Sequence, residues 1–156
     1  ESLMEMNFPV AESKYHYKVG PLMSQLGAPC AKPPWAALSA LNLATGEIIW
    51  ESPLGDVGKM MGAPFALELG TPGAGGPLVT AGGLVFIGYT LDDTFRAFDL
   101  ATGEVLWQYD LPAAGTAIPV SYEVDGEQYV VIPAGGHTMY QSTLGDSVMA
   151  FRLPRK

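Results

Sequence analysis

The feature that most constrains this sequence is an internal repeat. Leu38–Gly55 reads LSALNLATGEIIWESPLG, and Phe95–Pro112 reads FRAFDLATGEVLWQYDLP, 57 positions later. In each copy an apolar run leads into Ala-Thr-Gly-Glu, and a second apolar run ends in a tryptophan, Trp50 or Trp107. Catalytic motifs seldom recur in this way, whereas structural units that stack side by side do. The repeat therefore predicts a fold built from successive similar units.

Each copy is expected to form a β-hairpin that turns at its Ala-Thr-Gly-Glu stretch. Gly46 and Gly103 can adopt a positive φ at low cost, and Thr45 and Thr102 can hydrogen-bond locally to fix the bend. The residues on either side alternate between two faces, as the side chains of a strand do. The sequence thus predicts two equivalent hairpins.

Further strands are expected around the second hairpin. The stretch GGPLVTAGGLVFIGYTLDD predicts strands over 77–80 and 84–88, joined by a tight turn at 81–83. Together with the hairpin they form an antiparallel meander from about 77 to 110. After it, TAIPVSYEV, the Asp125-Gly126 turn, EQYVVIPAGG and SVMAFRLP predict three more strands.

Four-stranded units that recur every 50 to 60 residues and end in Trp are typical of β-propeller blades. The fold class is therefore predicted to be all-β, a partial propeller of about two to three four-stranded antiparallel blades. Trp50 and Trp107 are expected to wedge between neighbouring blades, each burial being worth a few kcal/mol. The expected division has an extended loop or partial blade over 1–36 and propeller blades over 37–156, namely the end of one blade (37–55), a complete blade (75–112) and a final blade without its outer strand (115–156).

Composition narrows the class of protein. Apolar residues make up 48% of the chain and charged residues 15%, which is enough apolar material for a packed core. The formal net charge of −8 argues against binding to nucleic acid. The single cysteine, Cys30, cannot form an internal disulfide, and no Cys/His cluster indicates a metal site.

No apolar run is long enough to span a bilayer, and the opening ESLMEMNFPV has no signal-peptide pattern and no initial Met. The chain is expected to be a portion of a longer protein.

The motif A-x-[DN]-x-x-T-G-E-x-x-W resembles the tryptophan-docking repeat of the pyrroloquinoline quinone (PQQ) dependent dehydrogenases, which are eight-bladed propellers that oxidise alcohols or sugars. The segments GPLMSQLGAPCAKPPWAALSALNLATGEIIW, GGPLVTAGGLVFIGYTLDDTFRAFDLATGEVLW and YEVDGEQYVVIPAGGH are similar to the C-terminal part of the membrane-bound glucose, polyol and quinate branch. The resemblance covers most of residues 20–154. It implies the C-terminal fragment of a PQQ-dependent sugar or polyol dehydrogenase, completing the propeller and part of the cofactor and substrate rim, and inactive alone.

The resemblance also implies where a parent protein acts and what it binds. It implies the periplasmic face of the bacterial inner membrane, PQQ with Ca²⁺ or Mg²⁺ in the full-length protein, a sugar or polyol substrate and a quinone acceptor. The partners of this chain would be the remaining N-terminal blades, with none of the cofactor expected on the fragment by itself. The open edges of such a fragment carry a risk of self-association.

Few of the family's site residues can be carried onto this chain. The resemblance implies that Gly75 and Gly76 approach the cofactor, where their backbone N–H groups can meet an anionic tricarboxylate; the alternative is a plain strand-entry turn. It also implies that His137 lies at the mouth of the substrate pocket, where an imidazole can hydrogen-bond a hydroxyl; the alternative is a loop histidine with no role. Some family members have a Trp where this chain has Gly73-Ala74. No catalytic base and no metal ligand is assigned to this chain.

A second function class remains open from the sequence. A non-catalytic propeller with PQQ-like repeats can act as a protein-binding scaffold. Such propellers have blades of about 40 to 45 residues with short loops, whereas the spacing here is 57 residues and includes the GGP and GGH segments. The spacing therefore favours the enzyme class. Asp92 and Asp93 are interpreted as ordinary acidic turn residues.

Overall fold

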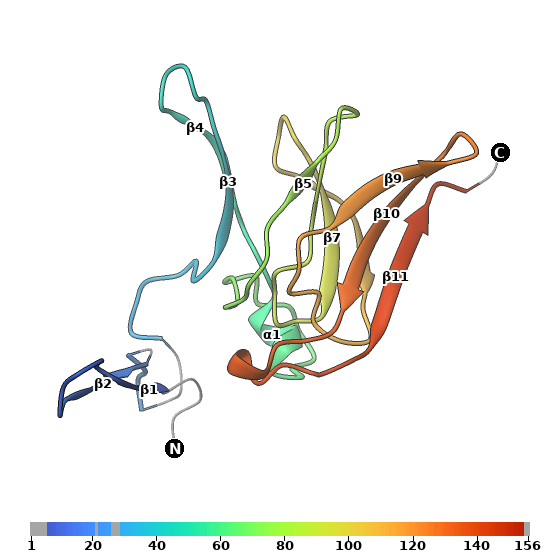
Figure 1. Ribbon diagram of the computed structural model, residues 1–156. Coiled ribbons are helices and arrows are strands. Elements are labelled where there is room, and N and C mark those ends of the chain that lie inside the picture. Colours follow the sequence, from blue (N-terminus) through green and yellow to red (C-terminus); the bar gives the residue numbers. More distant parts are fainter. Residues whose placement is uncertain (1–5, 21, 26–28, 155–156) are drawn as a thin grey trace.

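A computed structural model describes residues 6–20, 22–25 and 29–154 of the chain. The described residues form short strands and almost no helix (Figure 1). The elements are β1 (Met6–Pro9), β2 (His16–Val19), β3 (Ala37–Leu41), β4 (Ile48–Pro53), α1 (Val57–Met60), β5 (Leu78–Val79), β6 (Leu84–Ile87), β7 (Thr94–Asp99), β8 (Val105–Asp110), β9 (Val120–Val124), β10 (Glu127–Ala134), the 3₁₀ helix η1 (Thr138–Tyr140) and β11 (Ser147–Arg152).

The strands form antiparallel sheets that follow one another along the chain. Their orders are β1-β2, β3-β4, β5-β6-β7-β8 and β11-β10-β9. The last three sheets stand side by side in Figure 1, with β3 and β4 on one side of the four-stranded sheet and β9 to β11 on the other. The predicted all-β fold class is confirmed, and the three sheets have the form of a partial propeller.

The core lies between successive sheets, and β7 is buried on both of its faces. One apolar cluster joins Phe95 to Val130 and Ile132 of the three-stranded sheet. A second cluster joins Phe98 of the same strand to Leu54, which follows β4. Phe95 and Phe98 are fully buried, and burial of one such side chain is worth about 1.5–3 kcal/mol. The sheets are therefore held together through β7.

The two repeated hairpins turn in the same way. Asn42 and Asp99 each accept hydrogen bonds through Oδ1 from the backbone N–H groups two and three residues later. Gly46 and Gly103 have φ values of 76° and 74°. The pairing of the two strands shifts register at the equivalent place in both hairpins. The shift follows Ala40 in the first hairpin and Ala97, 57 positions later, in the second. The Asn or Asp of the A-x-[DN]-x-x-T-G-E motif, to which no role in the turn was assigned from the sequence, thus shapes these turns together with the threonines.

The β1-β2 hairpin, the helix α1 and the 3₁₀ helix η1 were not predicted. The β1-β2 hairpin lies within the segment 1–36 that was expected to be an extended loop or partial blade; residues 1–5, 21 and 26–28 of that segment lie outside the described residues. The helix α1 follows β4 and begins after Asp56, whose Oδ1 accepts hydrogen bonds from the N–H groups of Lys59 and Leu67. A helix of four residues is too short to leave an apolar periodicity in the sequence.

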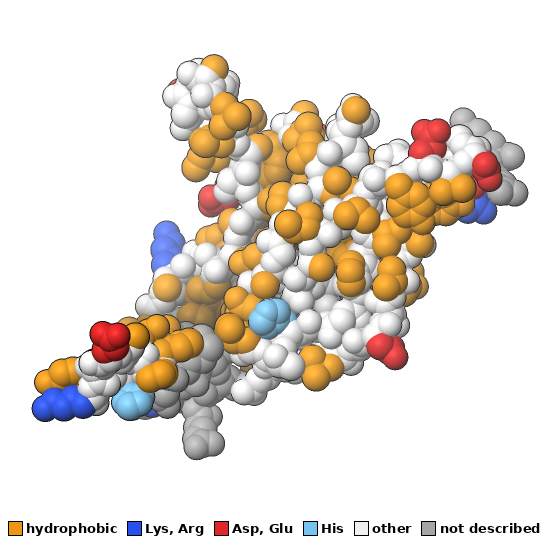
Figure 2. Space-filling view, viewed as in Figure 1, with side chains coloured by type: hydrophobic (Ala, Val, Ile, Leu, Met, Phe, Trp, Pro, Cys, Tyr) orange, Lys and Arg blue, Asp and Glu red, His pale blue; other side chains and the backbone are white. Residues whose placement is uncertain are grey.

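Apolar side chains are exposed over much of the surface. Figure 2 shows them spread over the sheets and over the loops. They include Leu43, Ile48, Ile49, Met61, Phe65, Ile118, Leu144, Val148 and Leu153, each more than half exposed. No helix among the described residues has the length and hydropathy needed to cross a membrane. The exposed faces are the surfaces on which the predicted self-association depends.

Candidate functional site

The long connections between strands all lie at one end of the sheets. Because the strands are antiparallel, successive connections fall at alternate ends. The short turns 80–83, 100–104 and 125–126 lie at one end, and the longer segments 54–77, 88–93, 111–119 and 135–146 lie at the other, beside α1 (Figure 1). We call this second end the loop end. Both predicted site segments, the glycine pair and the histidine, belong to it.

Backbone hydrogen bonds join the loops at this end from one sheet to the next. Thr71 N–H donates to the Leu54 carbonyl at 2.9 Å, and Ala74 N–H donates to the Tyr89 carbonyl at 3.1 Å. Tyr89 N–H donates to the Gly115 carbonyl at 3.0 Å. Gly136 N–H continues the series by donating to the Ala114 carbonyl at 2.9 Å. The loops therefore form one connected layer across the three sheets.

The glycine pair lies on the surface of this layer. Gly75 is exposed with φ of 118°, a conformation that favours glycine. A Cβ at Gly75 would lie 3.0 Å from the carbonyl oxygen of Ala117, and one at Gly76 would lie 3.3 Å from the Ile118 side chain. Neither glycine N–H donates a hydrogen bond to another described residue. Among the described residues these two N–H groups have no acceptor, and backbone N–H groups of this kind can bind anions.

His137 follows β10 and begins the loop that contains η1. Its ring lies 5.0 Å from the Tyr140 ring, and its backbone N–H donates to Ser142 Oγ at 2.7 Å. The side chain is half-buried, and Nδ1 is enclosed without a hydrogen-bond partner among the described residues. The ring thus packs against a residue of its own loop.

One segment connects the two predicted sites. Ala117 packs against Gly75, and the neighbouring Thr116 donates its hydroxyl to the Gly136 carbonyl at 3.1 Å. The connection between β8 and β9 therefore contacts both Gly75 and Gly136, the residue before His137.

Trp50 and Trp107 differ in their surroundings. Trp50 is half-buried, its Nε1–H donates to the Leu100 carbonyl at 2.9 Å, and its ring covers Gly103. Trp107 is 38% exposed, less buried than expected, and packs edge-on against Phe151. The difference arises because no described turn covers Trp107 as the Gly103 turn covers Trp50. Trp50 thus docks on the next sheet, while one part of the Trp107 ring faces outward.

A buried polar cluster at the loop end was missed in the sequence. Asp92, 2% exposed, pairs with the guanidinium of Arg96 and accepts hydrogen bonds from Thr90 Oγ1 at 2.5 Å and Asp56 N–H at 2.7 Å. Burial works against its ionisation, but Arg96, Thr90 and Asp56 N–H together hold the pKa of Asp92 below its usual value. The cluster joins the segment before α1 to the loop between β6 and β7. The sequence does show an Asp four residues before an Arg. This spacing alone does not indicate that the two side chains pair with each other.

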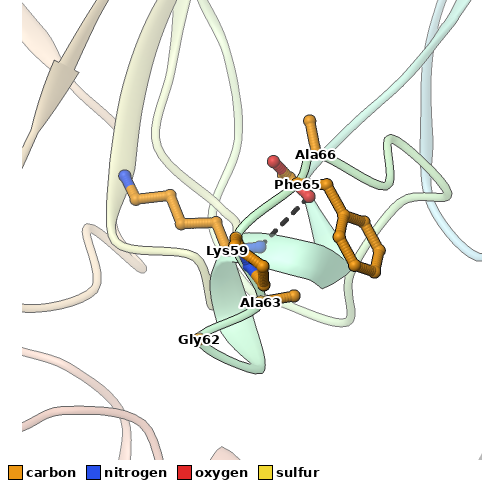
Figure 3. Close-up of a pocket in the computed structure, with 7 residues that line it drawn as sticks. Lys59, Gly62, Ala63, Phe65 and Ala66 are labelled. Carbon is orange, nitrogen blue, oxygen red and sulfur yellow. Dashed lines mark hydrogen bonds between the residues drawn. The ribbon is translucent and has the colours of Figure 1, made fainter.

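Lys59 of α1 forms a second polar link. Its ammonium donates to Thr94 Oγ1 at 2.6 Å and pairs with Asp110, which ends β8. A cavity of about 380 Å³ lies beside it, lined by Asp56, Lys59 and residues 62–66. Figure 3 shows the Lys59 side chain pointing away from the Phe65 ring at this cavity.

A second cavity, of about 270 Å³, lies between Lys59, Leu111 and Thr143. Asp93 lines it, and burial, together with the charge of Asp92, raises the pKa of Asp93 although Thr143 and Lys59 act in the other direction. Neither cavity is lined by the glycine pair or by His137. Among the described residues no three His, Cys, Asp or Glu side chains are grouped so that they could hold a metal ion.

A family model described as "PQQ: Glucose/ethanol/alcohol dehydrogenase, beta-propeller domain" matches residues 2–130 of the chain. The chain belongs to this family. The PQQ dehydrogenase assignment agrees with the repeated hairpins, the successive sheets and the Trp50 docking contact.

Several curated relatives match most of this chain. It is 42% identical over 144 residues to quinoprotein glucose dehydrogenase of Escherichia coli (strain K12), covering 90% of this chain and 18% of that protein. It is 38% identical over 158 residues to the glycerol dehydrogenase large subunit of Gluconobacter thailandicus, covering 96% and 21%. It is 41% identical over 154 residues to the probable quinate dehydrogenase (quinone) of Xanthomonas campestris pv. juglandis, covering 94% and 19%.

A solved structure supports the same PQQ dehydrogenase fold. The quinohemoprotein alcohol dehydrogenase from Comamonas testosteroni matches with a TM-score of 0.58 and 26% identity, over 82% of this chain and 18% of that chain. The chain therefore spans about a fifth of the length of the relatives that it matches.

Proposed function

We propose that this chain is the C-terminal portion of a PQQ-dependent sugar or polyol dehydrogenase. In that protein it completes the propeller and supplies part of the rim around cofactor and substrate; by itself it is inactive. The observation that carries the proposal is the loop end, where Gly75, Gly76 and Gly136, the residue before His137, contact one connection in a chain of this family. The named relatives are dehydrogenases of glucose, glycerol and quinate, which supports a polyhydroxylated substrate.

The roles of the three residues follow from their chemistry. When bound, PQQ accepts the hydride from a carbon that carries a hydroxyl group. The free N–H groups of Gly75 and Gly76 would hold an anionic oxygen of the cofactor, and the His137 ring would hydrogen-bond a substrate hydroxyl. The carboxylate that takes the hydroxyl proton, and the ligands of Ca²⁺ or Mg²⁺, belong to the N-terminal blades in this proposal.

The proposal includes the surroundings of the whole protein. The remaining N-terminal blades are the partners of this chain, and they cover the open sheet faces. The full-length protein works on the periplasmic face of the bacterial inner membrane and passes electrons to a quinone. Support for this placement comes from the similarity to the membrane-bound glucose, polyol and quinate branch.

The experiment is reconstitution of the full-length protein. It is purified without cofactor, loaded with PQQ and Ca²⁺ or Mg²⁺, and assayed with a dye acceptor on glucose, glycerol and other polyols. Reduction of the dye that requires both PQQ and a polyol supports the proposal. An absence of PQQ-dependent reduction over this panel contradicts it and favours the scaffold class, which a search for bound protein partners would then test.

A further inference from the structure

Tyr89, which lies in the connection between β6 and β7, has a backbone conformation that is unusual for a large side chain. Its φ is 61°, in the left-handed region where glycine is favoured and a bulky residue is an outlier. The neighbouring Gly88 is not in this region. The strained position of this connection therefore falls on the tyrosine, although a glycine stands directly before it.

The left-handed backbone lets Tyr89 join two segments of the loop end. Its N–H donates to the Gly115 carbonyl at 3.0 Å, and its carbonyl accepts from the Ala74 N–H at 3.1 Å. In an antiparallel sheet, by contrast, the N–H and C=O of one hydrogen-bonded residue both face a single partner. The φ of Tyr89 thus serves the backbone links to both segments. Glycine could make the same links without strain, so they do not explain why the side chain is a tyrosine.

The side chain of Tyr89 lies along the segment that leads to the glycine pair. A Cβ at Gly73 would lie 2.8 Å from Cδ1 of the Tyr89 ring, so the ring fits here because position 73 is a glycine. The tyrosine is half-buried and packs against the apolar cluster that contains Leu54. Its hydroxyl is not enclosed, and it makes no hydrogen bond to a described residue. A ligand can therefore reach this hydroxyl at the loop end, where the ring lies against the residue two positions before Gly75.

We propose that Tyr89 is a specificity-determining residue of the rim, and that its hydroxyl forms a hydrogen bond with a hydroxyl group of the polyhydroxylated substrate. A large side chain in a left-handed position costs stability, and strain of this kind is found mainly at functional sites. Packing against Leu54 uses the ring but not the hydroxyl, and phenylalanine would supply it equally well. This inference rests on the proposed function, because it adds a substrate contact to the same rim.

The contact is tested first without turnover. Full-length protein is labelled with 3-fluorotyrosine, and the Tyr89 signal in ¹⁹F NMR is assigned by its loss in Tyr89→Phe. Glucose and glycerol are titrated into the protein without cofactor and into the protein loaded with reduced PQQ. A saturable shift of the Tyr89 signal is expected, while the signal of Tyr122, exposed on β9, stays unchanged. A Tyr89 signal that neither compound moves in either state overturns the proposal.

The role of the hydroxyl is tested in the active enzyme by Tyr89→Phe. This variant keeps the ring and its packing, so it should unfold at the same denaturant concentration as wild type. The KM for the polyol is expected to rise about 3- to 10-fold, the loss of one hydrogen bond, with kcat nearly unchanged. Tyr122→Phe is the matched control and leaves KM unchanged, because Tyr122 lies on an exposed strand away from the loop end.

Tyr89→Gly separates the side chain from the backbone. Glycine adopts the same φ without strain and can keep the hydrogen bonds to Gly115 and Ala74, so a purely backbone role predicts an unchanged KM. We expect KM to rise at least as much as in Tyr89→Phe.

An unchanged KM in both variants overturns the proposal. A weaker affinity for PQQ with an unchanged KM in Tyr89→Phe means that the hydroxyl contacts the cofactor, and it overturns the proposal too. If the wild-type protein has no PQQ-dependent activity, the proposed function fails, and the fluorine titration alone decides whether Tyr89 contacts a polyol.

Discussion

Asp92 and Asp93 show how much the surroundings of a single residue decide its chemistry. Asp92 turns inward to Arg96, Thr90 and the Asp56 N–H, and its pKa is lowered by these partners in spite of its burial. Asp93 has φ of 54°, its Oδ1 is buried without a partner among the described residues, and its pKa is raised by burial. Both were expected from the sequence to be ordinary turn residues, because neither the partners of Asp92 nor the burial of Asp93 can be inferred from neighbouring residues in the sequence.

Removal of the Arg96 guanidinium should lower the free energy of unfolding. Arg96→Met leaves the Asp92 charge buried and unpaired, and breaking a buried pair in this way costs about 3–5 kcal/mol of unfolding free energy. Denaturant unfolding of the purified protein measures it. Arg152→Met is the matched control, because Arg152 is exposed and lies 3.4 Å from Glu127; such pairs contribute about 0–1 kcal/mol. Equal losses in both variants would show that the buried pair has no special role.

The charge of Asp93 should lower the stability of the folded protein, whereas the pair of Asp92 with Arg96 raises it. Since its folded-state pKa is raised, its contribution to stability is present below the unfolded pKa and is lost as pH rises through the folded pKa. Asp93→Asn removes the charge and tolerates the left-handed backbone. The variant should therefore unfold at higher denaturant than wild type at pH 7, and the difference should shrink as pH falls below about 4.

The control for Asp93→Asn is Asp125→Asn. Asp125 has nearly the same φ, 53°, but is exposed in the turn between β9 and β10. Its variant should follow the wild-type stability over the same pH range. A wild-type protein more stable than Asp93→Asn at pH 7 would mean that the Asp93 charge is favourably paired.

At the scale of elements, one contact that joins successive sheets is the docking of Trp50 on the turn that contains Gly103. The indole donates to Leu100 O, and Ser52 Oγ donates to Gly103 O at 2.8 Å. Gly103 is buried against the indole ring, while the equivalent Gly46 has nothing within 4 Å of where a Cβ would lie. The same sequence motif thus has a different packing role in each copy.

Substitutions at Gly46 and Gly103 allow the cost of backbone strain to be measured separately from the cost of disturbed packing. Gly46→Ala costs only the positive φ, about 1–2 kcal/mol. Gly103→Ala costs the same strain and also places a Cβ 2.5 Å from Trp50 Cε3, so the ring must move and its hydrogen bond to Leu100 lengthens. The loss in unfolding free energy should exceed that of Gly46→Ala by about 1–3 kcal/mol. Denaturant titration with tryptophan fluorescence measures both; equal losses would mean that the docking contact adds nothing.

The repeated hairpins could be predicted because their turn chemistry is local. The Leu84–Ile87 strand and the tight turn before it were also predicted, because apolar runs bounded by glycines indicate strands. The helix α1 and the β1-β2 hairpin were not predicted, because the helix and each of the two strands have only four residues, too few to show a clear periodicity.

The site is harder to predict than the fold. The connection between Gly75 and His137 runs through Thr116 and Ala117, and contacts between distant segments depend on how whole sheets stack.

At the scale of the whole molecule, the three sheets present large uncovered surfaces. β11 pairs only with β10, so its other edge is open among the described residues. Val148 of this strand is 68% exposed and Ile48 of β4 is 60% exposed. Since the chain spans about a fifth of its relatives' length, the proposed N-terminal blades supply both the cover for these faces and the greater part of the rim at the loop end.

Cofactor binding should therefore require the neighbouring blades. The isolated 156 residues contribute the free N–H groups of the glycine pair, and the described residues hold no cluster of metal ligands. Two hydrogen bonds to an anionic oxygen add about 3–6 kcal/mol, whereas micromolar binding needs about 8 kcal/mol. Titration of the isolated chain with PQQ and Ca²⁺, followed by quenching of tryptophan fluorescence, should show weak or no binding, while the full-length protein binds at micromolar concentration or below. Tight, stoichiometric quenching by the isolated chain would mean that the main cofactor contacts lie within it, and that the proposed division of the site between blades is wrong.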